Sequence, residues 1–144
     1  PWQEFKQLLA EPYIRGRELT AAVLGDRALL VTELVPTSGF YDFDAKYTDG
    51  MTQHVCPADI PENITKLCLD YALQAHRLLG CRGTSRADFR WDDSKPGTSG
   101  LVILELNTQP GMTPLSLAPE QARWAGISWP DLMTWMIDHA RRPS

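Results

Sequence analysis

The chain has 144 residues, 43% of them hydrophobic and 22% charged, which suits one globular domain with a substantial core. Its net charge of -4 and its lack of a basic run argue against nucleic acid or an anionic membrane as a partner, and no apolar stretch approaches membrane-spanning length. The three cysteines form no C-x-x-C pair and are odd in number, which argues against a disulfide framework and favours a reducing cytoplasm.

The first third of the chain is predicted to form strands and loops. Residues 8–14 have the pattern of a short strand that leads into an Arg15-Gly16 turn. Two β-rich runs, 18–24 and 28–35, flank Gly25-Asp26, a pair typical of a hairpin turn. Residues 36–50 combine few aliphatic residues with Thr-Ser-Gly and Thr-Asp-Gly, so we expect a loop there.

The clearest helix is predicted over residues 60–79. Asp59 suits its N-cap, Pro61 its first turn and Gly80 its end. Its apolar residues follow the i, i+3, i+4, i+7 spacing of one buried face, and they are Ile64, Leu67, Cys68, Tyr71, Ala72, Ala75, Leu78 and Leu79.

Two runs that alternate polar with apolar residues, 86–90 and 103–107, flank the turn-rich segment 91–100 and predict an antiparallel hairpin. If Ala87, Phe89, Leu104 and Leu106 face the core, the opposite face carries Arg86, Asp88, Glu105 and Asn107. Three hard oxygen ligands and a permanent cation suit a magnesium ion and a transferring phosphoryl group. Alternation alone favours polar residues on an ordinary solvated sheet face, and it is the loop after the second strand that favours a site.

The last part of the chain is predicted to hold a shaped loop and two helices. Residues 107–119 show no regular period, and their prolines and Gly111 indicate a defined loop. A short helix is expected near 120–125 and a final one over 129–140, which begins with the capping-box-like run Ser128-Trp129-Pro130-Asp131. Because hairpins dominate, the expected fold class is α+β.

Several of these segments together are similar to one family. Residues 105–113, followed by 116–119, resemble the C-terminal signature of the D-alanine–D-alanine ligases, which belong to the ATP-grasp carboxylate–amine ligases. Residues 86–89 resemble the motif that precedes it, residues 40–47 the mobile active-site loop, and residues 11–20 the adenine- and ribose-binding hinge. The resemblance implies one ATP-grasp C-terminal domain over residues 1–144, with a largely antiparallel sheet and helices packed on one face.

The resemblance also implies the role of each site residue. Magnesium or manganese, in two ions, would be bound by Asp88, Glu105 and Asn107. Arg86 would neutralise phosphoryl charge, Gly111 would offer its N–H to the tetrahedral oxyanion, and Ser116 and Leu117 would hold the carboxylate of the second D-alanine. For Ser116, the residue pattern alone favours a loop hydroxyl that bonds its own backbone.

The nucleotide residues follow from the same resemblance. Glu18 would accept hydrogen bonds from the ribose, and Glu11, Tyr13 and Ile14 would frame the adenine, although Pro12 replaces a Lys often found in that hinge. Lys46 would reach the phosphates, while Tyr41 and Tyr47 would close the loop over the site. Tyr13 could equally be a plain strand aromatic, and Lys46 an exposed lysine.

The implied activity is ATP-dependent ligation of two D-alanines through an acyl phosphate, in the cytoplasm, for peptidoglycan precursors. Such ligases are longer than this chain, so we expect a fragment that lacks the N-terminal substrate domain and the phosphate loop and is inactive alone; a homodimer is compatible with the family. The alternatives are another ATP-grasp ligase, including a D-alanine–D-lactate ligase, or a folded module without turnover. The Lys46-Tyr47 pair favours the dipeptide product. No role is assigned to His54, His76 or His139.

Overall fold

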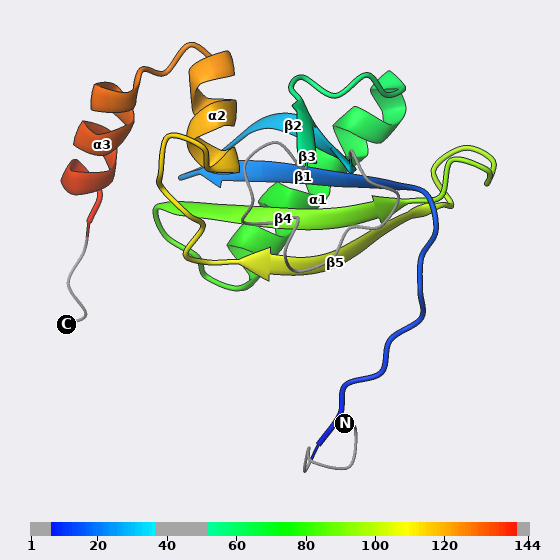
Figure 1. The fold of residues 1–144 in the computed structure, drawn as a ribbon. Coiled ribbons are helices and arrows are strands. Elements are labelled where there is room, and N and C mark those ends of the chain that lie inside the picture. Colours follow the sequence, from blue (N-terminus) through cyan, green and yellow to red (C-terminus); the bar gives the residue numbers. More distant parts are fainter. Residues whose placement is uncertain (1–6, 37–51, 141–144) are drawn as a thin grey trace.

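The computed structural model describes residues 7–36 and 52–140. These residues form a five-stranded sheet, in the order β3-β2-β1-β4-β5, and three helices (Figure 1). All four neighbouring strand pairs are antiparallel. The strands are β1 (Arg17–Leu24), β2 (Arg27–Pro36), β3 (Thr52–Val55), β4 (Thr84–Trp91) and β5 (Leu101–Asn107), and the helices are α1 (Glu62–Leu78), α2 (Leu117–Trp124) and α3 (Trp129–Asp138). The α+β class and both predicted hairpins are confirmed.

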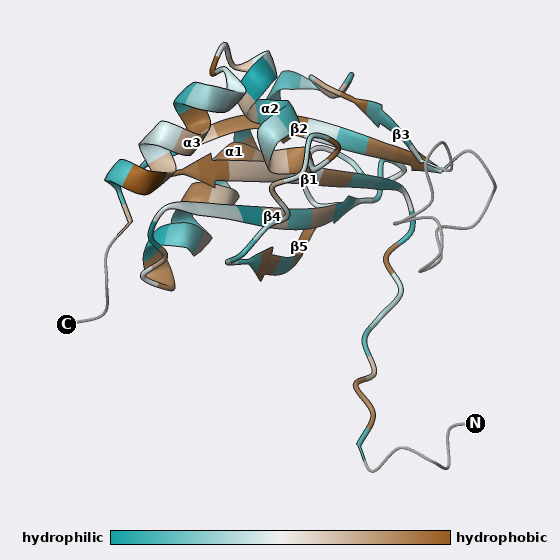
Figure 2. Ribbon diagram, turned by 60° about the vertical axis from the view of Figure 1, so that its left-hand side comes forward, coloured by the Kyte–Doolittle hydropathy of each residue, from teal (hydrophilic) through white to brown (hydrophobic). Residues whose placement is uncertain are grey.

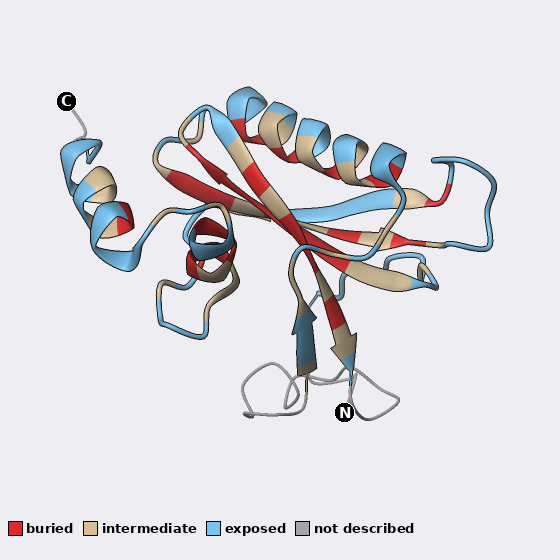
Figure 3. Ribbon diagram, turned by 90° about the horizontal axis from the view of Figure 1, so that it is seen from above, coloured by how far each residue is buried: buried red, intermediate tan, exposed pale blue. Residues whose placement is uncertain are grey.

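The two faces of the sheet are covered differently. Helix α1 packs on one face against a core built around Leu19, Val31 and Phe89. Helices α2 and α3 pack in a second core with Ala22 and Leu24, and Figure 3 shows α1 and α2 on opposite sides of the sheet. The prediction that the helices pack on one face of the sheet is therefore wrong. The unbroken buried run from Leu19 to Leu24 on β1 explains it, because both faces of this strand need a covering layer.

Helix α1 presents a narrower face than its sequence predicts. Its buried residues lie four apart and are Ile64, Cys68, Ala72 and His76. Leu78 and Leu79 are exposed, because the helix has passed the sheet by that point. The N-cap is Pro61, with no side-chain cap, so the expected capping by Asp59 is wrong. Gly80 ends the helix with a φ of 64°, as expected.

Two strand predictions also fail. Residues 8–14 form no strand and are largely exposed. In β5, a register shift between Asp88 and Phe89 of the partner strand places Ile103, not Leu104, opposite Phe89. Leu104 is consequently 50% exposed and does not face the core as expected.

The C-terminal helices close the second core. Helix α3 begins at the predicted residue, and the Ser128 hydroxyl accepts a hydrogen bond from the Asp131 N–H as its cap. Leu132 is buried, whereas Ile137 of the predicted apolar stripe is 74% exposed. The central strands carry much of the hydrophobic sequence (Figure 2). Within the described ranges, every helix is too short or too polar to span a bilayer.

Candidate active site

Strand register gathers the polar residues of three strands on one face of the sheet. Directly opposed residues share a face, as do residues two apart on one strand. Glu18 lies opposite Arg90, and Thr20 opposite Asp88. By the same pairing rules this face, which α1 does not cover, carries Glu18 and Thr20 of β1, Arg86, Asp88 and Arg90 of β4, and Glu105 and Asn107 of β5.

The Asp88 carboxylate is the centre of this group. The Arg86 guanidinium donates two hydrogen bonds to it, from Nε at 2.8 Å and from Nη2 at 2.7 Å. The hydroxyl of the fully buried Thr20 donates a third at 2.7 Å. This bidentate pair fixes the carboxylate in one orientation and keeps a cation beside it. Asp88 is thus presented at the surface of the sheet on a rigid strand rather than on a loop.

Glu105 lies directly opposite Asp88, and Asn107 opposite Arg86. The Asn107 side-chain oxygen accepts the Gln109 N–H at 2.9 Å and so begins the long loop that follows β5. Two carboxylates and an amide oxygen on one open strand face are the oxygen donors that magnesium prefers, so the residues present fit such an ion. Among the described residues, no three His, Cys, Asp or Glu side chains are grouped so that they could hold a metal ion. The expected ligand set has only two carboxylates beside an asparagine, so it is not a group of that kind.

The loop after β5 runs across the sheet to α2 (Figure 1). Ser116 is the N-cap residue of α2 and Leu117 its first residue. The Ser116 hydroxyl accepts the Thr113 N–H at 3.0 Å and pairs with the Thr113 hydroxyl at 2.9 Å. The Ser116 N–H is bonded to the Thr113 carbonyl, so it is not available to a substrate carboxylate in this conformation. The Ser116 hydroxyl and the Leu117 N–H stay compatible with the expected carboxylate contact, which remains a prediction.

Gly111 lies against Ser116. A Cβ atom at this position would meet the Ser116 Oγ at 2.8 Å, closer than non-bonded atoms tolerate. Glycine is therefore required here for the hydroxyl to keep its place. The loop thereby brings two residues with predicted roles into direct contact.

The predicted nucleotide hinge lines a pocket of about 570 Å³. Tyr13, Ile14 and Glu18 contribute to its wall, as does Leu104, which the register shift in β5 turns toward this face. Pro12 also lines it, whereas Glu11 does not. The sequence did not single out Arg90, although it continues the Arg86, Asp88 period of β4.

Two ion pairs border this pocket. Arg90 donates to the Ile14 carbonyl at 3.0 Å and pairs with Glu18 at 3.4 Å. Arg17 makes a bidentate pair with Glu33, and its Nε–Oε1 distance is 2.6 Å. The hydrogen bond from Glu33 raises the pKa of Arg17 above its ordinary value. The polar lining is therefore charge-balanced before any ligand binds.

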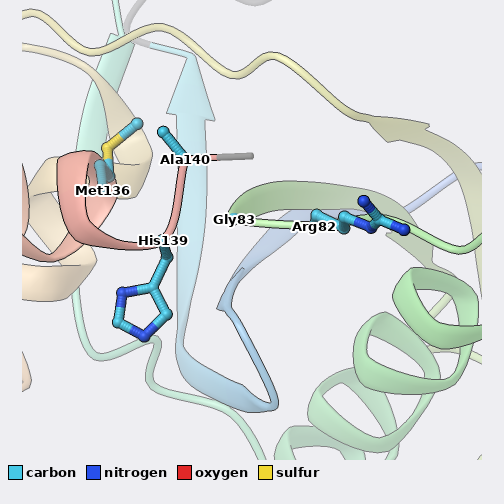
Figure 4. A pocket seen from close by; sticks show the side chains of 5 residues that line it. All are labelled: Arg82, Gly83, Met136, His139 and Ala140. Carbon is cyan, nitrogen blue, oxygen red and sulfur yellow. The ribbon is translucent and has the colours of Figure 1, made fainter. Parts of the chain in front are cut away.

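A second pocket, of about 170 Å³, is lined by none of the described site residues. Met136, His139 and Ala140 contribute to it from the end of α3, and Arg82 and Gly83 from the turn before β4 (Figure 4). The His139 ring stacks on Trp135 with centroids 4.0 Å apart, and its Nδ1 is 2.7 Å from the Trp135 carbonyl. These contacts give His139 a structural role at the C-terminal end of α3.

The buried titratable groups lie under the opposite face. Burial raises the pKa of the Cys68 thiol to about 12, which makes it an inert core residue. His76 is buried and bonds the Ser85 hydroxyl through Nδ1 at 2.7 Å, and burial lowers its pKa. All three cysteines are free, as expected.

Tyr41, Lys46 and Tyr47 lie outside the described residues, as does the whole predicted mobile loop. The described residues place the predicted hinge and the Asp88 cluster on one face of the sheet, and the loop after β5 leads from that face to α2. The expected contributions of Lys46 and of both tyrosines remain predictions.

Residues 2–138 match the family model described as D-ala D-ala ligase C-terminus. The chain is 71% identical over 140 residues to the D-alanine–D-alanine ligase of Novosphingobium aromaticivorans and 70% identical to that of Erythrobacter litoralis. Each alignment covers 97% of this chain but only 44% and 43% of the relative, so the chain spans less than half of the curated relatives that it matches.

Solved structures give the same fold. The D-alanine–D-alanine ligase of Coxiella burnetii superposes with a TM-score of 0.71 at 30% identity, over 90% of this chain and 33% of that one. The Bacillus anthracis enzyme complexed with ATP gives a TM-score of 0.71 at 28% identity, over 88% of this chain and 40% of that one.

Proposed function

We propose, because this chain belongs to the D-ala D-ala ligase C-terminus family, that it forms the ATP-binding and second-substrate-binding part of a D-alanine–D-alanine ligase. The observation that carries the proposal is the single sheet face on which a nucleotide-sized pocket, the Asp88 cluster and the start of α2 follow one another. This order matches the three parts that such a reaction must align: a nucleotide, a transferring phosphoryl group and an amine.

In the first step, the γ-phosphoryl group of ATP would pass to the carboxylate of one D-alanine, giving an acyl phosphate and ADP. Asp88, Glu105 and Asn107 would hold one or two magnesium or manganese ions, which neutralise phosphate charge when bound. Arg86 would add a fixed positive charge beside the transferring group. Its bidentate contact with Asp88 keeps the guanidinium in place for this task.

In the second step, the amine of the other D-alanine would attack the acyl carbon, and inorganic phosphate would leave. The Ser116 hydroxyl can donate to the carboxylate of this substrate if the Thr113 hydroxyl supplies the proton of their shared hydrogen bond. The Leu117 N–H lies at the N-terminus of α2, where a carboxylate is favoured. Gly111 would offer its N–H to the tetrahedral oxygen.

The predicted mobile loop completes the proposal. Lys46 would contact the phosphates, and Tyr41 and Tyr47 would close the loop so that water does not hydrolyse the acyl phosphate. The remaining domains of the full-length enzyme would supply the first D-alanine site and the phosphate loop. The product would serve peptidoglycan precursor synthesis in the cytoplasm.

The test uses the full-length enzyme that carries this chain. ADP release and D-alanyl-D-alanine formation are measured with ATP, magnesium and D-alanine, and again with D-lactate added as the competing second substrate. We expect the dipeptide as the main product. ADP release without dipeptide, or with the D-lactate ester as the main product, would assign the chain to another ligase of the ATP-grasp group.

A further inference from the structure

The segment before β1 contacts the sheet through Arg90. Residues 7–15 form no strand. Two side-chain contacts link this segment to β4, and both come from Arg90. Its Nε donates to the Ile14 carbonyl at 3.0 Å, and its guanidinium carbon lies 5.9 Å from the Tyr13 ring centroid. The predicted adenine-binding hinge therefore depends on a residue of β4 for its position.

The same guanidinium also reaches the predicted ribose-binding carboxylate. Arg90 and Glu18 are directly opposed in the β1–β4 pairing, and their Nη1–Oε2 distance is 3.4 Å. Both side chains are mostly buried, and both line the 570 Å³ pocket. A guanidinium offers five N–H groups in a rigid fork, so it can serve a carbonyl and a carboxylate at once.

We propose that Arg90 is a positioning residue for the nucleotide, because it holds the Ile14 carbonyl and the Glu18 carboxylate in one arrangement that admits both the base and the ribose. This inference rests on the proposed function and adds a source of specificity to it. Glu18 accepts hydrogen bonds from ribose hydroxyls only when its carboxylate is correctly oriented, and Arg90 sets that orientation. Loss of Arg90 should therefore weaken nucleotide binding and also reduce the preference for a ribose over a deoxyribose nucleotide.

An ordinary ion pair on a sheet surface would behave differently. Such a pair contributes little to stability, so its loss would leave nucleotide binding unchanged. The Lys95–Asp92 pair in the turn between β4 and β5 is such an ordinary pair, with an Nζ–Oδ2 distance of 3.7 Å. Neither of its residues lines the pocket, so it offers the comparison.

The experiment uses the full-length enzyme with Arg90→Met, Arg90→Lys or Lys95→Met. Steady-state kinetics give KM and kcat for ATP and for 2′-deoxy-ATP, and calorimetry gives ATP binding without turnover. For Arg90→Met we expect KM for ATP to rise roughly tenfold, kcat to change by less than about twofold, and the preference for ATP over 2′-deoxy-ATP to shrink. Arg90→Lys should fall between Arg90→Met and the wild type, since an ammonium is a point charge without the fork. Lys95→Met should keep the wild-type KM and nucleotide preference.

Melting temperatures of all three variants separate binding from folding. If Arg90→Met does not fold, Arg90→Lys alone decides, and a wild-type KM and nucleotide preference in that variant would overturn the proposal. An Arg90→Met enzyme whose affinity for ATP is unchanged, or falls equally for both nucleotides, would also overturn it. A wild-type enzyme that makes no dipeptide would instead reject the proposed function, so the two failures are distinguishable.

Discussion

At the scale of single residues, the site depends on short contacts that hold polar atoms in fixed positions. The Asp88 carboxylate accepts three hydrogen bonds from Arg86 and Thr20. Alternation in the sequence predicted which residues share this face, because the side-chain period of a strand is fixed. It could not predict the contact between Gly111 and Ser116, since that contact depends on the path of an irregular loop.

A methyl group at Gly111 should disturb the Ser116 hydroxyl. In the full-length enzyme, Gly111→Ala must rotate or displace that hydroxyl, because the added Cβ would lie 2.8 Å from it. We expect KM for the second D-alanine to rise several-fold, at about 1 kcal/mol per lost hydrogen bond, while KM for ATP stays unchanged. Substrate titrations of D-alanine and ATP check this. An equal increase in both values would contradict the localised effect.

His76 should make the stability of the 144-residue chain depend on pH. Burial lowers its pKa in the folded state below the ordinary value of 6.5, so the unfolded chain binds the proton more tightly. The free energy of unfolding is therefore unaffected by this group above about pH 6.5 and falls as the pH drops below that value. Urea unfolding at pH 7.5 and 5.5 should show a larger loss for the wild type than for His76→Gln. Equal losses of stability in the two proteins would show that His76 does not contribute to the pH dependence of folding.

At the scale of elements, the sequence predicted those whose signals are local. Both hairpins and helices α1 and α3 carry turn residues, caps or a clear period. Strand β3 was missed because its four residues show no apolar alternation and depend on β2 for their pairing. The strand expected over residues 8–14 has no partner strand, and Leu104 turned outward at an irregularity that no local pattern reveals.

Helix α2 is fixed to the sheet by Gln121. This buried side chain accepts the Ala22 N–H at 2.7 Å and donates to the Thr20 carbonyl at 3.2 Å and the Thr32 hydroxyl at 3.1 Å. This polar link to β1, the strand that supports Asp88, adds to the apolar packing of Ala118 and Ala122 on the same strand and to the Glu120–His54 ion pair with β3.

Gln121→Leu should destabilise the 144-residue chain by about 2–4 kcal/mol, because it leaves buried polar groups without their partner. Urea unfolding measures the change. Ser85→Ala is the matched control, since it removes one buried hydrogen bond, to His76, under the opposite face. It should cost only about 1–2 kcal/mol. Equal effects of the two variants would mean that Gln121 is not the main anchor of α2.

At the scale of the whole molecule, one sheet face orders the parts of the site. The pocket beside Glu18 and Arg90 lies toward the start of β1, the Asp88 cluster comes next, and α2 follows over Ala22. The opposite face is covered by α1 and carries the inert buried groups. The family resemblance predicted the members of this arrangement. Their order along the face became visible only with the strand register.

The 144-residue chain should fold but form no dipeptide. Its two cores join the sheet to all three helices, whereas curated relatives are more than twice as long and would hold the remaining part of the active site. A cooperative urea transition combined with the absence of D-alanine-dependent ADP release is the expected result. Measurable D-alanine-dependent ADP release from the isolated chain would contradict it.

The central claim, that the Asp88 face carries the chemistry, is tested most directly by the rate of dipeptide formation in full-length Asp88→Asn. Asp93→Asn, an exposed position in the turn of the same hairpin, is the control. We predict a loss of at least roughly a hundredfold for Asp88→Asn, with a melting temperature close to that of the wild type, and near wild-type activity for Asp93→Asn. Wild-type dipeptide formation by Asp88→Asn would contradict the claim.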